Sequence, residues 1–272
     1  MLNIKKDKIN YKQFKSTPMN ILFVETAAHG HFVNLYLNLI LLKIKKNFKV
    51  SISLMVTHEV YKNIDIEIKK KVKNVFFFKE VTQPINKNFL NLTFYQLRYY
   101  FNIRFFFLKY CDSNLPDHVY FNTIDHCDKA ISVFGSPFSN ISFSGIFSTT
   151  KFHLSKYKIG PSFPLNFLYK YLFKKILKIE TLKYLFVIDP LLISFFDKKK
   201  ERNHNKLIYV QDAVNTNYPT ISNKHILNLK KKFLITKNSF VIIVYGAIGP
   251  NKSLKELIDA LQGKKFKKEL VL

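Results

Sequence analysis

Residues 19–46 read MNILFVETAAHGHFVNLYLNLILLKIKK, and this stretch decides the fold. The continuous apolar run Ile21–Val24 predicts a strand that is buried on both sides, and a turn of small residues follows it at Thr26–His31. Apolar residues then occupy nearly every side of a predicted helix over Phe32–Lys46, as expected for a helix against a parallel sheet. A buried strand that leads through a tight turn into a helix opens a Rossmann-like unit.

The same alternation of strands and helices continues through the following residues. We expect further strands at Val50–Val56, Val75–Phe78, His118–Phe121, Ile141–Ser144, Tyr184–Ile188 and Leu207–Val210. We expect helices at Glu59–Lys71, Asn91–Tyr110, Asp125–Phe134, Phe163–Ile179, Leu191–Phe196 and Lys224–Leu234. This order predicts an α/β fold with a Rossmann-like, doubly wound parallel sheet.

A second opening of the same kind begins at Phe240. Phe240–Tyr245 predicts a buried strand, and a helix starts at Ser253, which forms an S-x-x-E capping box with Glu256. The residues after Gly263 leave room for one more strand. We therefore expect a disordered lead-in at 1–18, a Rossmann-like domain at 19–205, and a linker with the start of a second, incomplete Rossmann-like domain at 206–272.

Composition limits the partners and the compartment. The net charge is +26, from 44 basic and 18 acidic residues, and arginine occurs only at positions 98, 104 and 202. The lysine excess fits either the codon bias of an A+T-rich genome or an anionic partner such as a membrane surface. Nucleic acid is disfavoured, because its readers use arginine heavily for bidentate contacts. Two cysteines and no apolar leader predict a reducing, cytoplasmic location.

The two strand-to-helix turns are the candidate binding sites. Gly246, Lys252 and Ser253 lie where free backbone N–H groups of a helix start and a lysine would hold a diphosphate, although an ordinary turn with an incidental lysine has the same pattern. His29 and His31 flank Gly30 at the carboxyl end of the first strand, where open α/β sheets bind ligands. Either histidine could orient a hydroxyl group, act as a base or simply be solvated.

The second turn also carries a family resemblance. Val244–Ser253, followed by Leu257-Ile258-Asp259-Ala260, resembles the opening of the donor domain in family 4 retaining glycosyltransferases of the GT-B fold. Met19–Tyr36 is similar to the opening of their acceptor domain, and Asp189 and Asp212 fall at strand ends where relatives carry aspartates.

The resemblance implies a hexosyltransferase that moves a sugar from a nucleotide-sugar donor to a saccharide or lipid-linked acceptor in polysaccharide biosynthesis, with no cofactor or metal. It matches Lys252 and Gly246 to the loop that contacts the donor diphosphate, and His29, Gly30 and His31 to the acceptor cleft. Ala247 and Gly249 stand where relatives often carry an arginine, and Ser253 replaces a glycine. The family's donor domain continues further and includes two sugar-binding glutamates, so no catalytic residue is assigned here.

Other readings remain open. A chain with an incomplete donor domain could be an inactive, truncated transferase, a non-catalytic remnant or a binding module. A basic membrane-surface protein is a further alternative, because the predicted helix Phe163–Ile179 is amphipathic. It places Lys170, Lys174 and Lys178 on one side and Leu168, Leu172, Ile176 and Ile179 on the other. That helix would either expose a solvated lysine face or lie on an anionic membrane, peripheral at its inner face.

Overall fold

The structure is a computed structural model, and it describes residues 19–25, 37–47, 49–82, 84, 89–111, 115–148, 151–157, 160–198, 203–211, 221–236, 239–242, 254–261 and 269–271. The lead-in predicted at 1–18 lies outside these residues. The chain divides into two compact units, Met1–Val214 and Asn215–Leu272. This division falls later in the chain than the expected boundary between residues 205 and 206.

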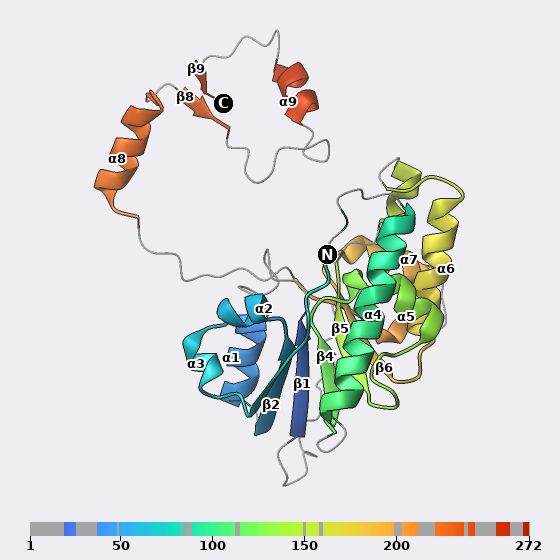
Figure 1. Ribbon diagram of the computed structural model, residues 1–272. Coiled ribbons are helices and arrows are strands. Elements are labelled where there is room, and N and C mark those ends of the chain that lie inside the picture. The colour runs from blue at the N-terminus through green and yellow to red at the C-terminus, as the bar shows by residue number, and fades with distance from the viewer. Residues whose placement is uncertain are drawn as a thin grey trace. The chain divides into compact units, whose positions relative to one another are not determined.

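The first unit alternates strands and helices (Figure 1). Its strands are β1 (Met19–Glu25), β2 (Val50–Val56), β3 (Asn74–Phe77), β4 (His118–Phe121), β5 (Phe143–Phe147), β6 (Leu182–Val187) and β7 (Leu207–Tyr209). Its α-helices are α1 (Asn38–Asn47), α2 (His58–Lys62), α3 (Ile66–Lys69), α4 (Phe89–Cys111), α5 (Asp128–Phe134), α6 (Leu165–Leu177) and α7 (Pro190–Lys198). Short 3-10 helices are η3 (Ile124–His126), η4 (Phe152–Tyr157) and η5 (His204–Lys206).

The strands form one seven-stranded sheet in the order β3-β2-β1-β4-β5-β6-β7. Every neighbouring pair in it is parallel. Because β1 continues to β2 on one side while β4 lies on its other side, the sheet is doubly wound. The fold class predicted from the alternation of elements is confirmed.

Helices cover the sheet from both faces, and successive residues of β1 point to different faces. Phe23 packs in a cluster with Leu41 of α1, whereas Leu22 and Val24 belong to a second cluster with residues of α4, α5, α6 and α7. Figure 1 shows α4, α5 and α6 side by side in one layer. Burial on both faces explains the continuous apolar run Ile21–Val24 of β1.

β5 runs unusually close to β4 at Gly145. A Cβ atom added there would overlap the carbonyl oxygen of Phe121 and lie 2.7 Å from Cδ1 of Ile124. Only glycine allows this approach, which brings the polar residues after β4 next to those after β5.

The prediction of a single helix over Glu59–Lys71 is wrong. The structure has two short helices, because α2 ends at Lys62 and α3 begins at Ile66. Oδ1 of Asp65 accepts a hydrogen bond of 2.7 Å from the backbone N–H of Glu67 and caps α3. Aspartate favours helix starts over helix interiors, because its side chain bonds nearby backbone N–H groups.

Two predicted elements that follow β4 have different bounds in the structure. The helix expected over Asp125–Phe134 is divided at Cys127, whose φ of −145° is not helical, into η3 and α5. The strand expected at Ile141–Ser144 begins at Phe143, because the backbone N–H of Ile141 donates to the carbonyl of Phe138 in a turn.

α6 is shorter than the predicted Phe163–Ile179, and its apolar side differs from the prediction. Ile176 is buried and Leu172 and Ile179 are half-buried, but Leu168 is exposed. The buried residues of the helix are Phe173, Ile176 and Leu177, all in its second half. Of the three predicted outer lysines, Lys178 is exposed while Lys170 and Lys174 are half-buried.

The second unit contains α8 (Asn223–Lys232), β8 (Ser239–Val241), α9 (Leu254–Leu261) and β9 (Glu269–Val271). β8 and β9 pair in parallel, with α9 between them in sequence. The predicted second strand-and-helix opening and its additional strand are therefore present. None of the helices that the structure describes in either unit is long and apolar enough to cross a membrane.

Candidate functional site

The residues predicted to bind ligands lie outside the part of the chain that the structure describes. They are His29, Gly30, His31, Gly246, Lys252 and Ser253. Their roles stay predictions. The strand ends that flank the first of these turns are described, and they carry a set of polar side chains.

The carboxyl ends of β1 and β4 form the switch point of the sheet, which is where open α/β sheets bind ligands. Glu25 ends β1, and its side chain is fully buried. Its Oε2 accepts hydrogen bonds from Nδ2 of Asn122 and, at 3.0 Å, from Oγ1 of Thr123, the two residues that follow β4. A buried carboxyl group is costly without such partners, so these bonds stabilise an acidic group at the switch point.

Asp125 connects the segment after β4 to the end of β5. Its Oδ1 and Oδ2 accept hydrogen bonds from the backbone N–H of Ser148 at 3.1 and 3.0 Å, and Oδ2 accepts another from Ser148 Oγ at 3.1 Å. These bonds fix the carboxylate beside the switch point.

A cavity of about 280 Å³ opens beside Asp125. Its lining includes Gln96, Asp128, Lys129, Lys151 and Tyr169. Gln96 holds two of the other lining segments, because its Oε1 accepts from the backbone N–H of Lys129 and its Nε2 donates to the carbonyl of Asp125. The cavity therefore combines acidic, basic and aromatic groups at the carboxyl edge of the sheet.

Burial, followed by the negative charge of the neighbouring Asp125, raises the pKa of Asp128 to about 7. The charge and backbone N–H of Lys129 and the side chain of Gln96 act in the opposite direction. A carboxyl group that titrates near neutral pH can take or give a proton, which is the property that general acid–base chemistry requires.

A histidine–aspartate pair lies at the carboxyl end of β6. Nε2 of His153, in η4, is 2.7 Å from Oδ2 of Asp189, and the histidine side chain is 1% exposed. Because a carboxylate only accepts, Nε2 carries the hydrogen. Oδ1 of Asp189 accepts at 2.9 Å from the backbone N–H of Leu191 in the first turn of α7. The sequence predicted Asp189 at a strand end. In the structure it follows β6 and links η4 to the start of α7.

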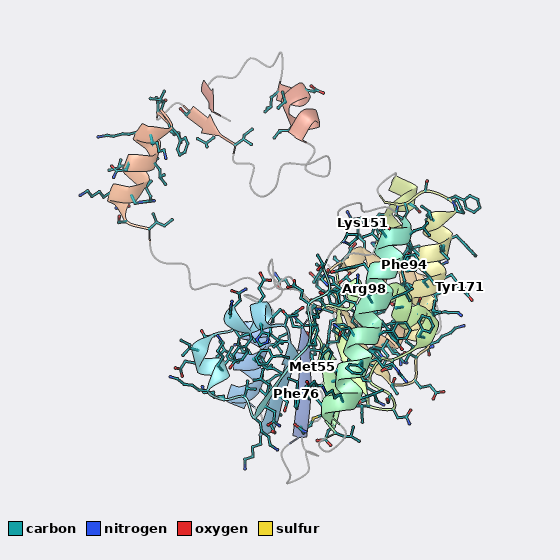
Figure 2. The ribbon with its side chains drawn as sticks, in the orientation of Figure 1. Met55, Phe76, Phe94, Arg98, Lys151 and Tyr171 are labelled. Carbon is teal, nitrogen blue, oxygen red and sulfur yellow. The ribbon has the colours of Figure 1, made fainter. Side chains whose placement is uncertain are left out.

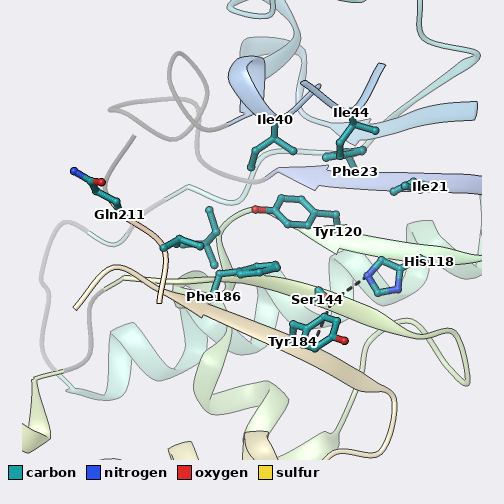
Figure 3. Close-up of a pocket in the computed structure, with 12 residues that line it drawn as sticks. Ile21, Phe23, Ile40, Ile44, His118, Tyr120, Ser144, Tyr184, Phe186 and Gln211 are labelled. Atoms are coloured by element: carbon teal, nitrogen blue, oxygen red, sulfur yellow. Dashed lines mark hydrogen bonds between the residues drawn. The ribbon is translucent and has the colours of Figure 1, made fainter. Parts of the chain in front are cut away.

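The opposite face of the sheet carries an apolar trough of about 490 Å³ (Figure 3). Phe23, Tyr120 and Phe186 from the strands and Ile40 from α1 line it, and Gln211 lies at one end. His118 lines the trough with both ring nitrogens bonded, to Ser142 Oγ at 2.8 Å and to Ser144 Oγ at 3.1 Å.

Burial, followed by the charge of Lys183, lowers the pKa of His118 to about 4. Its ring is therefore neutral at neutral pH. None of the lining residues that the structure describes is charged, so this part of the trough is unsuited to phosphate groups.

Sequence reasoning missed Glu25, Asn122, Thr123, Asp128 and His153 as site residues. The sequence does contain a signal for Glu25, Asn122 and Thr123, since each lies at the end of a buried parallel strand or directly after it. His153 had no such signal, because its partner is a distant residue and η4 has no regular pattern. Among the described residues, no group of three or more His, Cys, Asp or Glu side chains is placed to hold a metal ion.

No protein-family model matches the sequence, and a search of curated proteins finds no relative. Several solved structures are similar to this chain in fold. Arabidopsis thaliana UGT89C1, complexed with UDP, aligns at 13% identity with a TM-score of 0.51, over 84% of this chain and 58% of that one. A UDP-glucose:anthocyanidin 3-O-glucosyltransferase in complex with UDP aligns at 12% identity with a TM-score of 0.52, over 91% and 65%. A UDP-GlcNAc 2-epimerase from Neisseria meningitidis, bound to UDP-GlcNAc, aligns at 14% identity with a TM-score of 0.47.

These likenesses concern the fold. The chain spans 58% and 65% of the lengths of the two glycosyltransferases. It has the Rossmann-like α/β architecture of the GT-B type, as the parallel seven-stranded sheet and the later strand–helix–strand unit also indicate.

Proposed function

We propose that the chain is a glycosyltransferase of the GT-B type that moves a sugar from a nucleotide-sugar donor to an acceptor hydroxyl. The observation that carries the proposal is the coincidence of two features. The fold resembles that of glycosyltransferases solved with UDP, and the carboxyl edge of its sheet holds a cavity lined by acidic, basic and aromatic side chains, with Asp128 at its wall.

The acceptor fits the first unit. Tyr169 and Phe147 offer aromatic faces on which a sugar ring packs, while Asp125 and Lys151 offer partners for hydroxyl groups. Asp128, with its pKa near neutrality, is placed to receive the proton of an acceptor hydroxyl. His29, Gly30 and His31 follow Glu25 in sequence and would complete this edge.

The donor fits the second unit. Lys252 would neutralise the diphosphate, with Gly246 allowing close backbone approach and Ser253 directly preceding α9 in sequence. When the bond from the anomeric carbon to the diphosphate oxygen breaks, the lysine stabilises the charge on the departing nucleoside diphosphate. From the family 4 resemblance we infer a hexose donor, retention of the anomeric configuration and a saccharide or lipid-linked acceptor. The NMR spectrum of the isolated product tests all three.

Calorimetric titration of the full chain with UDP tests the donor site. Wild type binds UDP, and Lys252→Ala weakens binding by about tenfold or more, because a lysine–phosphate contact is lost. Lys230→Ala removes a lysine from α8 in the same unit and leaves the affinity unchanged. Undetectable binding by wild type would remove the donor site from this chain.

A binding module is the second candidate, favoured by the chain's coverage of only part of the compared glycosyltransferases. UDP binding without release of UDP from any UDP-sugar in the presence of saccharide acceptors supports it. We also propose that Phe163–Ile179 contacts an anionic membrane, since Phe163 is 81% exposed and Phe167 is 67% exposed.

A further inference from the structure

α4 exposes an apolar stripe along its whole length. The exposed residues Leu90, Phe94, Arg98, Phe101, Phe105 and Leu108 recur every three or four positions, so they share one side of the helix. Phe94 is 63% exposed and Phe105 is 60% exposed. Arg98 is the one charged member of the stripe, and Figure 2 labels it together with Phe94.

The opposite side of the same helix already supplies the core. Tyr99, Ile103 and Phe107 are buried against the sheet and α5. The helix is therefore apolar on two sides, and packing within the first unit accounts for only one of them. A helix in contact with water on its outer side normally has a polar stripe there.

Neighbouring helices of the same layer extend this surface. Phe134 at the end of α5 is 52% exposed, and its ring centroid lies 5.5 Å from that of Phe101. On α6, Phe167 and Tyr171 are exposed as well, and Figure 2 shows Tyr171 on this helix. Scattered exposed apolar residues need no explanation, but a continuous aromatic surface marks a contact site.

The charged residues of α4 and α6 indicate which kind of partner this surface binds. Neither α4 nor α6 contains an aspartate or glutamate, while Arg98, Lys109 and Lys175 are exposed on them. Two copies of the chain docked through this surface would bring like charges together, in a protein that already carries a net charge of +26. An anionic lipid bilayer instead offers phosphate groups for the cations and an interfacial region for phenylalanine and tyrosine rings.

We propose that the outer stripe of α4, continued by Phe134, is the principal surface by which this protein docks onto anionic membranes. It extends the contact proposed for Phe163–Ile179 to a second and longer helix. The helix lies along the interface with its phenylalanine rings in the headgroup region and its cations at the phosphates. This docking does not depend on sugar transfer, so either can fail without the other.

Vesicle flotation of the full chain tests the proposal. Vesicles of phosphatidylcholine alone are compared with an equimolar mixture of phosphatidylcholine and phosphatidylglycerol. Wild type floats with the mixture, and salt weakens binding because charges are screened. Phe94→Gln and Phe105→Gln each lower the partition coefficient about fivefold, and the double variant lowers it by more than tenfold, as expected for partial burial of two aromatic rings.

Ile66→Gln is the matched control. Ile66 is 65% exposed on α3, which packs with the other helical layer, and its replacement leaves partitioning unchanged. Unaltered circular dichroism and melting temperature establish that the α4 variants are folded. The variant Phe167→Gln measures how much α6 contributes to membrane binding.

Three outcomes would overturn the inference. Wild type that does not float removes both membrane proposals. Binding that is lost in Phe167→Gln but kept in the α4 double variant limits the contact to α6. A wild-type dimer in sedimentation velocity that the α4 double variant converts to a monomer assigns the stripe to a second copy of the chain.

Discussion

Asp125 and Asp128 come from the same short segment after β4, and the structure gives their carboxyl groups different surroundings. Asp125 accepts hydrogen bonds from the backbone and side chain of Ser148. Asp128 lines the cavity with a pKa raised by burial and by Asp125. A pair of carboxyl groups in different surroundings, one of which has a raised pKa, is typical of sites that transfer protons.

The raised pKa of Asp128 makes a prediction about stability. Its folded-state pKa of about 7 exceeds the unfolded value of 3.8, so its favourable contribution is complete below pH 3.8 and is lost as the pH rises through 7. Asp128→Asn removes this loss. Relative to wild type, the variant gains on the order of 1–3 kcal/mol of unfolding free energy between pH 4 and pH 8. Urea unfolding at pH 4 and at pH 8 measures the difference in unfolding free energy between the variant and wild type. An equal difference at the two pH values would contradict the prediction.

His118 provides a control of opposite sign. Its folded-state pKa of about 4 lies below the unfolded value of 6.5, so its contribution is present above pH 6.5 and is lost as the pH falls towards 4. His118→Gln therefore lessens the acid-induced loss of stability. Asp128→Asn gains stability relative to wild type as the pH rises, whereas His118→Gln gains it as the pH falls, so the two variants shift the pH dependence in opposite directions, and a double variant tests whether the two effects add.

At the scale of elements, the pair of His153 and Asp189 joins η4 to the start of α7. Asp189 serves both elements, since one oxygen pairs with the buried ring and the other caps the helix. A short 3-10 helix such as η4 depends on such side-chain contacts for its position.

We predict that Asp189→Asn lowers the unfolding free energy by roughly 1–3 kcal/mol, because it weakens a buried charge-assisted hydrogen bond. The chain offers a matched control. His204 and Asp197 are also a histidine–aspartate pair, but their atoms are 3.9 Å apart and both side chains are about half exposed. Asp197→Asn changes stability by less than roughly 0.5 kcal/mol. Equal losses in the two variants, measured by urea unfolding, would show that burial of the pair is not what stabilises it.

At the scale of the whole molecule, the two units differ in how much they bury. The first contains the complete seven-stranded sheet and both hydrophobic clusters. In the second, α8 buries none of its residues, and the described sheet has two short strands.

The first unit should therefore fold by itself. We predict that a fragment of residues 1–214 unfolds in one cooperative transition with the α/β circular dichroism of the whole chain. A fragment of residues 215–272 should lack such a transition, because so short a segment buries too little apolar surface. Calorimetry of both fragments checks this, and loss of cooperative unfolding in the longer one would contradict it.

Most of the fold could be predicted from local patterns. Val50–Val56 and His118–Phe121 are strands with the predicted bounds, because a strand buried on both faces is predominantly apolar. Errors arose where side chains act locally, as at Asp65, which caps a helix inside the predicted Glu59–Lys71 segment.

The sequence by itself determined the alternation of strands and helices, and hence the parallel, doubly wound sheet, because each element shows its burial in its own residues. Only the tertiary structure decided which polar groups meet. Glu25 and Asn122 are far apart in sequence, and so are His153 and Asp189. The exposed stripe of α4 also emerged only there, since a helix that is apolar on two sides reads as a fully buried one. Strand order and helix placement decide such contacts, and no local pattern records them.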